Sequence, residues 1–180
     1  MLRMRRLRRD CEQKLAALPL PEPFTIEGLV AGMEAASGRT IQLVPLDDHG
    51  GDLRTACGLR VRTADLSLIL YRPRPTQHQT DHVKLHELVH EWFNHGTSLG
   101  ADELEQLLPE HLRHGLAQRM SGAVVQARAR YDTREEQEAE LSASLIKHIV
   151  QRQMPAGGDM VSLLETTLSH PVAAPRRAQR

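Results

Sequence analysis

Two histidines four residues apart, with a glutamate directly after the first, constrain this chain more than any other feature. They belong to the string His86-Glu87-Leu88-Val89-His90 in a chain of 180 residues. In an α-helix, side chains at positions i and i+4 lie on one face, so both imidazoles can reach one metal ion with Glu87 beside it. Apolar residues surround the histidines, as in a buried helix: Val83, Leu85, Leu88, Val89, Trp92 and Phe93. The string therefore predicts a helix that carries a metal site.

The spacing of these residues matches the HExxH pattern of zinc peptidases. Neutral imidazole nitrogens suit Zn2+, and a carboxylate beside a zinc-bound water can accept its proton. We therefore expect His86 and His90 to bind zinc and Glu87 to act as the general base. The chain has ten histidines, and His78 and His82 continue the four-residue spacing, so an exposed histidine stripe is the alternative. Only His86 and His90 enclose a glutamate in the required position.

Composition and charge limit the class of protein. A chain of 180 residues with 40% hydrophobic content is expected to form one domain with an ordinary core. The 23 basic and 23 acidic residues balance, which argues against attraction of the whole protein to nucleic acid. Cys11 and Cys57 form no CxxC pair, and the longest apolar run, Leu66–Tyr71, is too short to span a bilayer. No apolar signal segment follows the basic start, so we expect a cytoplasmic protein with no membrane partner.

Basic residues are concentrated near the start of the chain, where five arginines lie within the first nine residues. Apolar residues recur between and after them at near-helical spacing: Leu2, Leu7, Cys11, Leu15 and Leu18. This pattern indicates a helix with a solvated basic face. We favour it over a nucleic-acid-binding arm because the segment has no aromatic side chain for base stacking.

Local patterns predict helices on either side of a short run of strands. A first helix ends before Pro19, and a second covers Ile26–Ser37, with Thr25 as its N-cap and Gly38 as its stop. Strands are expected over 40–46, 56–62 and 66–71, and the histidine helix is expected to begin near Thr80. Further helices are expected over 102–108, 111–129, 133–153 and 160–168.

These elements predict an α+β fold: a small antiparallel three-stranded sheet packed with the histidine helix and further helices. One domain is expected over residues 1–170, followed by a disordered tail over 171–180.

A zinc site with two histidines needs a third protein ligand. The helix expected over residues 133–153 supplies four closely spaced carboxylates: Glu135, Glu136, Glu138 and Glu140. Glu136 and Glu140 share one face, so one can bind the metal while the other hydrogen-bonds a ligating imidazole. A solvated acidic face is the alternative, although Leu141, Leu145 and Ile146 indicate that this helix also packs inward.

Together the two motifs resemble the ImmA/IrrE-type metallopeptidases, which pair an H-E-L-x-H helix with a later helix reading roughly E-x-E-A-[ND]-x-F-A. The second motif here is Glu136-Gln137-Glu138-Ala139-Glu140-Leu141-Ser142-Ala143. The resemblance covers most of residues 10–150 and is specific only in the two motifs. It implies that His86 and His90 are zinc ligands, that Glu136 is the third ligand and that Glu87 is the base.

Two departures from the family pattern leave the third ligand open. Glu140 stands where the family has Asn or Asp, and Ser142 stands where it has Phe. If the helix is rotated relative to the family, Glu138 or Glu135 replaces Glu136 as the ligand.

In function, the resemblance implies a zinc metalloendopeptidase that cleaves a helix-turn-helix repressor in a bacterial or phage regulatory pair. A catalytically inactive zincin-like module that binds a regulatory protein is the alternative. A different zinc hydrolase and a DNA-associated protein using the basic arm also stay open. Glu87 favours an enzyme, because a structural zinc site needs no base beside its ligands. Four residues are candidates for stabilising the oxyanion: His95, His111, His114 and Tyr131.

Overall fold

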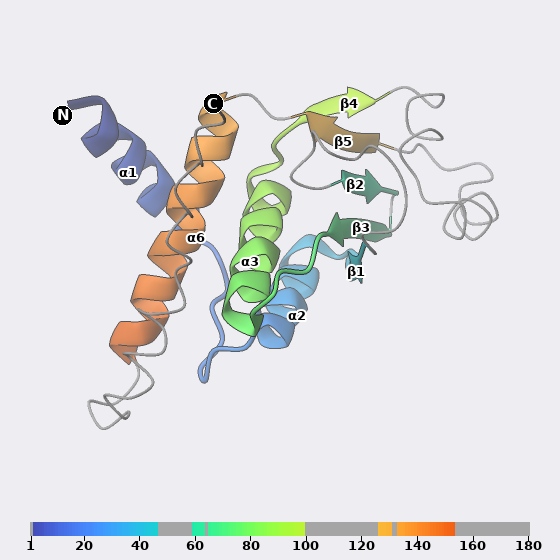
Figure 1. Cartoon of the computed structure of the whole chain (residues 1–180), viewed down its shortest axis with the longest axis horizontal. Helices are drawn as coiled ribbons and strands as arrows, with labels where there is room; N and C mark the ends of the chain where they lie inside the picture. The colour runs from blue at the N-terminus through green and yellow to red at the C-terminus, as the bar shows by residue number, and fades with distance from the viewer. Residues whose placement is uncertain (1, 47–58, 64, 100–125, 131–132, 154–180) are drawn as a thin grey trace, which may run out of the picture.

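The computed structural model describes residues 2–46, 59–63, 65–99, 126–130 and 133–153 (Figure 1). These ranges contain the following elements: α1 (Leu2–Leu15), α2 (Ile26–Ser37), β1 (Thr40–Pro45), β2 (Leu59–Arg62), β3 (Leu66–Tyr71), α3 (Gln77–Phe93), β4 (Thr97–Leu99), β5 (Gln126–Arg130) and α6 (Thr133–Gln153). The helices pack beside a single sheet, which confirms the α+β class. In the part of the chain described, no helix is both long and apolar enough to cross a membrane.

The histidine helix, α3, lies at the centre of the molecule. Figure 1 shows α6 and α1 on one side of α3, and α2 and the sheet on the other. One hydrophobic core joins these elements, with contributions from α1, α2, β1, β3, α3 and α6. From α3 the core receives Leu85, Leu88 and Val89, all nearly inaccessible to solvent. Because these side chains fix the rotation of α3 about its axis, they also fix the direction of His86 and His90.

The sheet differs from the expected antiparallel sheet of three strands. It has five strands in the order β1-β3-β2-β5-β4, and β1 runs parallel to β3 while the other pairs are antiparallel. All three predicted strands are present, but β1 and β2 are not neighbours. β3 turns back onto β2 and lies between them, so β1 joins on the far side of β3 and runs with it.

The two further strands, β4 and β5, were not expected. β4 has only three residues, too few to show a period of two in the sequence. β5 reads Gln-Ala-Arg-Ala-Arg, and because Ala and Arg favour helices, its first four residues fall in the helix expected over 111–129. Pairing with β2 on one side and β4 on the other makes this segment a strand instead. The helices expected over 102–108 and 160–168, the rest of the helix expected over 111–129, and the tail over 171–180 lie outside the described residues.

The bounds of α2 and α6 agree with the prediction. Thr25 caps α2 by accepting from the backbone N–H of Gly28, and Gly38 ends it in the left-handed region at φ 66°. α3 begins three residues earlier than expected, because Thr76 and Gln79 form a capping box at its start. β1 ends one residue earlier than expected, at Pro45, and β2 is described from Leu59.

Candidate metal centre

The two histidines of the α3 motif lie with their Nε2 atoms 3.0 Å apart. His90 is fully buried, and the side chain of His86 is 12% exposed. Both rings point from α3 toward α6, where they meet the carboxylate of Glu136. Glu136 Oε2 lies 3.5 Å from His86 Nε2, and Oε1 lies 3.5 Å from His90 Nε2.

His86, His90 and Glu136 form a group that could hold a metal ion, with one ligand atom from each lying within 4.8 Å of the others. These are the three residues that the sequence singles out as ligands. The other two candidates on α6 are engaged elsewhere: Glu135 accepts a hydrogen bond from Gly96 N, and Glu138 binds Lys14 and Arg134. The structure therefore places Glu136, and not Glu135 or Glu138, against both imidazoles.

Burial keeps both imidazoles neutral. Burial, together with the neighbouring His86, His95 and Arg60, lowers the pKa of His90 to about 2. Burial also lowers the pKa of His86, against the opposing effects of Glu136 and Glu140. A neutral imidazole has one unprotonated nitrogen, which is the form that binds a metal.

Glu140 lies beside the imidazole of His86, near Nδ1, whereas Glu136 lies near Nε2. Glu140 Oε2 is 3.6 Å from His86 Nδ1, and both carboxylate oxygens of Glu140 are 3.1 Å from His82 Nε2. This is the arrangement expected when a second carboxylate on the same helix face contacts a ligating histidine.

The carboxylate of Glu87 has an unusual environment. Its side chain is fully buried, and neither of its oxygens has a hydrogen-bond partner among the described residues. Burial raises its pKa to about 8, with Arg60 acting against the rise and Glu136 adding to it. A buried carboxylate without a hydrogen bond is costly, and a cation beside it would favour its ionised form. Glu87 thus fits a metal held by the neighbouring group.

Arg60 of β2 anchors the end of α3 that carries His90. Its guanidinium donates to the backbone carbonyls of His90 and His95 and to the carboxylate of Glu91, and its side chain is only 1% exposed. Glu91 also accepts from Arg62 and Ser67. This buried cluster fixes α3 to the sheet beside the candidate metal centre.

Sequence reasoning missed this cluster. A signal was present, because Arg60 and Arg62 alternate within a predicted strand, and one face of that strand must be buried. Glu91, next to His90 on a buried helix, is the corresponding acidic partner.

One of the four oxyanion candidates is in the described part of the chain. His95 contacts His90 through Nδ1, on the opposite side of the His90 ring from the Nε2 that faces Glu136. This position does not suit a group that stabilises an oxyanion. His111, His114 and Tyr131 lie outside the described residues.

Comparison with protein-family models, with curated proteins and with solved structures found no match to this chain. The resemblance to the ImmA/IrrE-type metallopeptidases therefore depends on the two sequence motifs.

Proposed function

We propose that this protein is a zinc-dependent metalloendopeptidase that acts inside the cell. The observation that supports it most is the buried carboxylate of Glu87, adjacent in sequence to His86 and without a hydrogen-bond partner among the described residues. Two imidazoles and one carboxylate are a ligand set used by catalytic zinc, which leaves a coordination position for water. A site that served only to hold the fold together would not need a buried carboxylate beside it.

In this proposal His86, His90 and Glu136 hold the zinc ion. Bound there, zinc would lower the pKa of a water and polarise the carbonyl of a peptide bond. Glu87 accepts the proton of the attacking water on its carboxylate and returns it to the nitrogen of the leaving amine. The burial of Glu87 excludes bulk water from this proton transfer, and Arg60 holds the helix end that carries His90.

We further propose that the substrate is a helix-turn-helix repressor encoded beside this chain. This substrate class is supported only by the resemblance of the two motifs to the ImmA/IrrE-type family. The second candidate is a catalytically inactive zincin-like module that binds such a regulator without cutting it. Glu87 again favours the enzyme, because binding alone would not require a general base in the site.

Co-expression with the adjacent regulator separates these two functions. Glu87→Gln keeps the shape of the side chain but removes its ability to accept a proton, so cleavage should fall by ~10²-fold or more. Glu12→Gln, the same substitution at an exposed position on α1, should cleave like the wild type. The length of the regulator and the zinc content of each purified variant are measured.

Loss of intact regulator with the wild type and with Glu12→Gln, but not with Glu87→Gln, would support the peptidase. A regulator that stays intact and co-purifies equally with all three proteins would support the binding module instead.

A further inference from the structure

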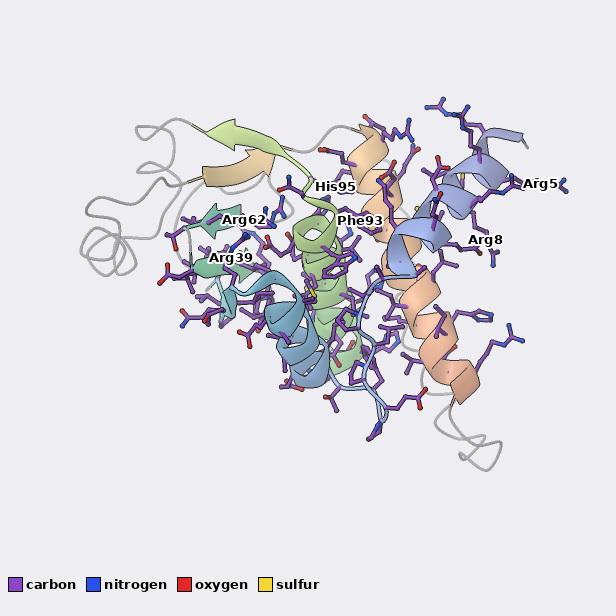
Figure 2. All side chains as sticks on the ribbon, turned by 180° about the vertical axis from the view of Figure 1, so that it is seen from behind. Arg5, Arg8, Arg39, Arg62, Phe93 and His95 are labelled. Atoms are coloured by element: carbon purple, nitrogen blue, oxygen red, sulfur yellow. The ribbon has the colours of Figure 1, made fainter. Side chains whose placement is uncertain are left out.

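His95 follows the end of α3 and is turned back against it. Asn94 ends the helix in the left-handed region at φ 59°, and the His95 N–H then donates to the carbonyl of His90 over 3.0 Å. Arg60 donates to the carbonyl of His95 from the sheet side. Figure 2 shows His95 at this end of α3, between the sheet and α6. Its side chain is 5% exposed, so its polar atoms need partners within the protein.

The partners of the His95 ring are a metal-ligand candidate on one side and a carboxylate on the other. Its Nδ1 is hydrogen-bonded to Nδ1 of His90 over 3.1 Å, whereas its Nε2 faces Oε2 of Glu138 at 3.4 Å, an ion-pair distance outside hydrogen-bond geometry. Glu138 is itself nearly buried, and it accepts hydrogen bonds from Lys14 of α1 and Arg134 of α6. Two cationic side chains therefore pair with this carboxylate, which favours its ionised form.

The order His90, His95, Glu138 determines which ring nitrogens of the two histidines carry protons. An ionised carboxylate only accepts, so the His95 nitrogen that faces Glu138 carries the proton of the neutral ring. The other nitrogen of His95, Nδ1, is then unprotonated and can only accept. The hydrogen bond between the two Nδ1 atoms therefore uses a proton on His90, which leaves Nε2 of His90 unprotonated. That Nε2 is the atom that faces His86 and Glu136.

We propose that His95 and Glu138 are positioning residues that hold His90 in the tautomer and orientation needed to bind a metal. They act through His90 and do not touch the metal or the substrate. The inference rests on the metal site of the proposed function, but it does not depend on peptide cleavage.

Ion pairs from two helices hold the carboxylate of Glu138 in place beside His95. Lys14 belongs to α1 and Arg134 to α6, so the carboxylate is held where the two helices meet. Trp92 of α3 donates to the carbonyl of Lys14, which ties α1 to the histidine helix as well. By contrast, the Glu140 carboxylate beside His86 is 60% exposed and must compete with water for its contact. We therefore expect His90 to be the more rigidly held of the two imidazoles.

Two nearly isosteric substitutions test the positioning role. His95→Asn keeps a side-chain oxygen that can accept from His90 Nδ1, whereas His95→Leu fills similar space without an acceptor. Zinc affinity is measured for each variant by competition with a chromophoric chelator. We expect His95→Leu to bind zinc ~10- to 100-fold more weakly than the wild type, and His95→Asn to recover most of that loss.

The tautomer of His90 is read directly by long-range ¹H–¹⁵N NMR spectra of the metal-free protein. The wild type should show His90 protonated at Nδ1 and unprotonated at Nε2, and His95→Leu should show a mixture of the two tautomers. A merely structural role for His95 would leave this spectrum unchanged.

Two results would overturn the inference: equal zinc affinity for the wild type and a folded His95→Leu variant, or a wild-type His90 protonated at Nε2. The second result requires no substitution, so it decides the matter even if His95→Leu does not fold. A wild type that has the expected tautomer but binds no zinc would refute the proposed function and leave the hydrogen bond from His90 to His95 established.

Discussion

Replacing Glu87, the proposed general base, should make the metal-free protein more stable. Glu87 is fully buried without a hydrogen-bond partner in the described part of the chain, and burial raises its pKa from 4.5 to about 8. The unfolded chain therefore releases the proton of this carboxyl near pH 4.5, while the folded protein keeps it until about pH 8. Between these values the unfolded state binds fewer protons, so the free energy of unfolding falls as the pH rises.

The size of this effect follows from the interval between the unfolded pKa and the working pH. Each pH unit contributes ~1.4 kcal/mol, and pH 7 lies about 2.5 units above the unfolded value, so ionisation of this residue costs about 3 kcal/mol of stability at pH 7. Glu87→Gln has no charge to release. The free energy of unfolding of the variant should exceed that of the wild type by about 3 kcal/mol at pH 7 and by nearly nothing at about pH 4.5, where the folded protein and about half of the unfolded chains carry the Glu87 proton.

Urea unfolding of the wild type and Glu87→Gln, with a chelator present, measures this difference at several pH values from 4.5 to 7.5. Glu12→Gln is the matched control, because its exposed carboxylate loses only a surface pair with Arg8 and should cost less than ~1 kcal/mol. An advantage for Glu87→Gln that does not change with pH, or a variant less stable than the wild type at pH 7, would refute the argument from burial. Under the proposed function this gain in stability accompanies a loss of hydrolysis, as expected where a buried group is kept for the reaction at a cost in stability.

Two further predictions concern the anchoring of α3 and the third ligand. Glu91→Gln should lower the free energy of unfolding by ~3–5 kcal/mol, because the side chain of Arg60, only 1% exposed, loses its counter-charge. Urea unfolding measures this loss, and the control variant Glu12→Gln should lose less than ~1 kcal/mol in the same experiment. Glu136→Ala should reduce zinc content, measured by metal analysis, far more than Glu135→Ala, whose carboxylate accepts from a backbone N–H instead. Equal loss of zinc in both variants would contradict the assignment of Glu136.

Local signals were sufficient to predict the four described helices and three of the five described strands. Thr25 and Gly38 mark the two ends of α2. The N-terminus needs a side-chain acceptor, which Thr25 supplies, and the C-terminus needs a residue that adopts the left-handed conformation, which Gly38 does. α6 was predicted to the residue because a long run with apolar residues at helical spacing leaves little choice. The capping box of α3 was overlooked, although Thr76 and Gln79 have the required spacing.

The strand order and β5 depend on pairing partners distant in the sequence. The parallel pairing of β1 with β3 and the insertion of β5 beside β2 are consequences of tertiary structure. The Ala and Arg residues of β5 favour a helix locally, so their own preference pointed to the wrong element.

At the candidate metal centre, the sequence predicted His86, His90 and one of three glutamates of α6, and the structure identifies Glu136 as the glutamate beside both histidines. The i, i+4 spacing was enough to place His86 and His90 together, and the pairing of Glu136 with Glu140 was visible from the same rule. The choice of Glu136 over Glu135 and Glu138 depends on how α6 is rotated against α3, which spacing does not determine. The role of His95 depends on the turn at Asn94, which brings the ring back to His90.

Zinc binding tests the central claim most directly. The wild type and the double variant His86→Ala, His90→Ala are dialysed against micromolar zinc, and bound metal is measured per chain while circular dichroism monitors folding. The account predicts about one zinc per wild-type chain and none above background for a folded double variant. A wild type that retains no zinc, or a double variant that retains as much as the wild type, would contradict it.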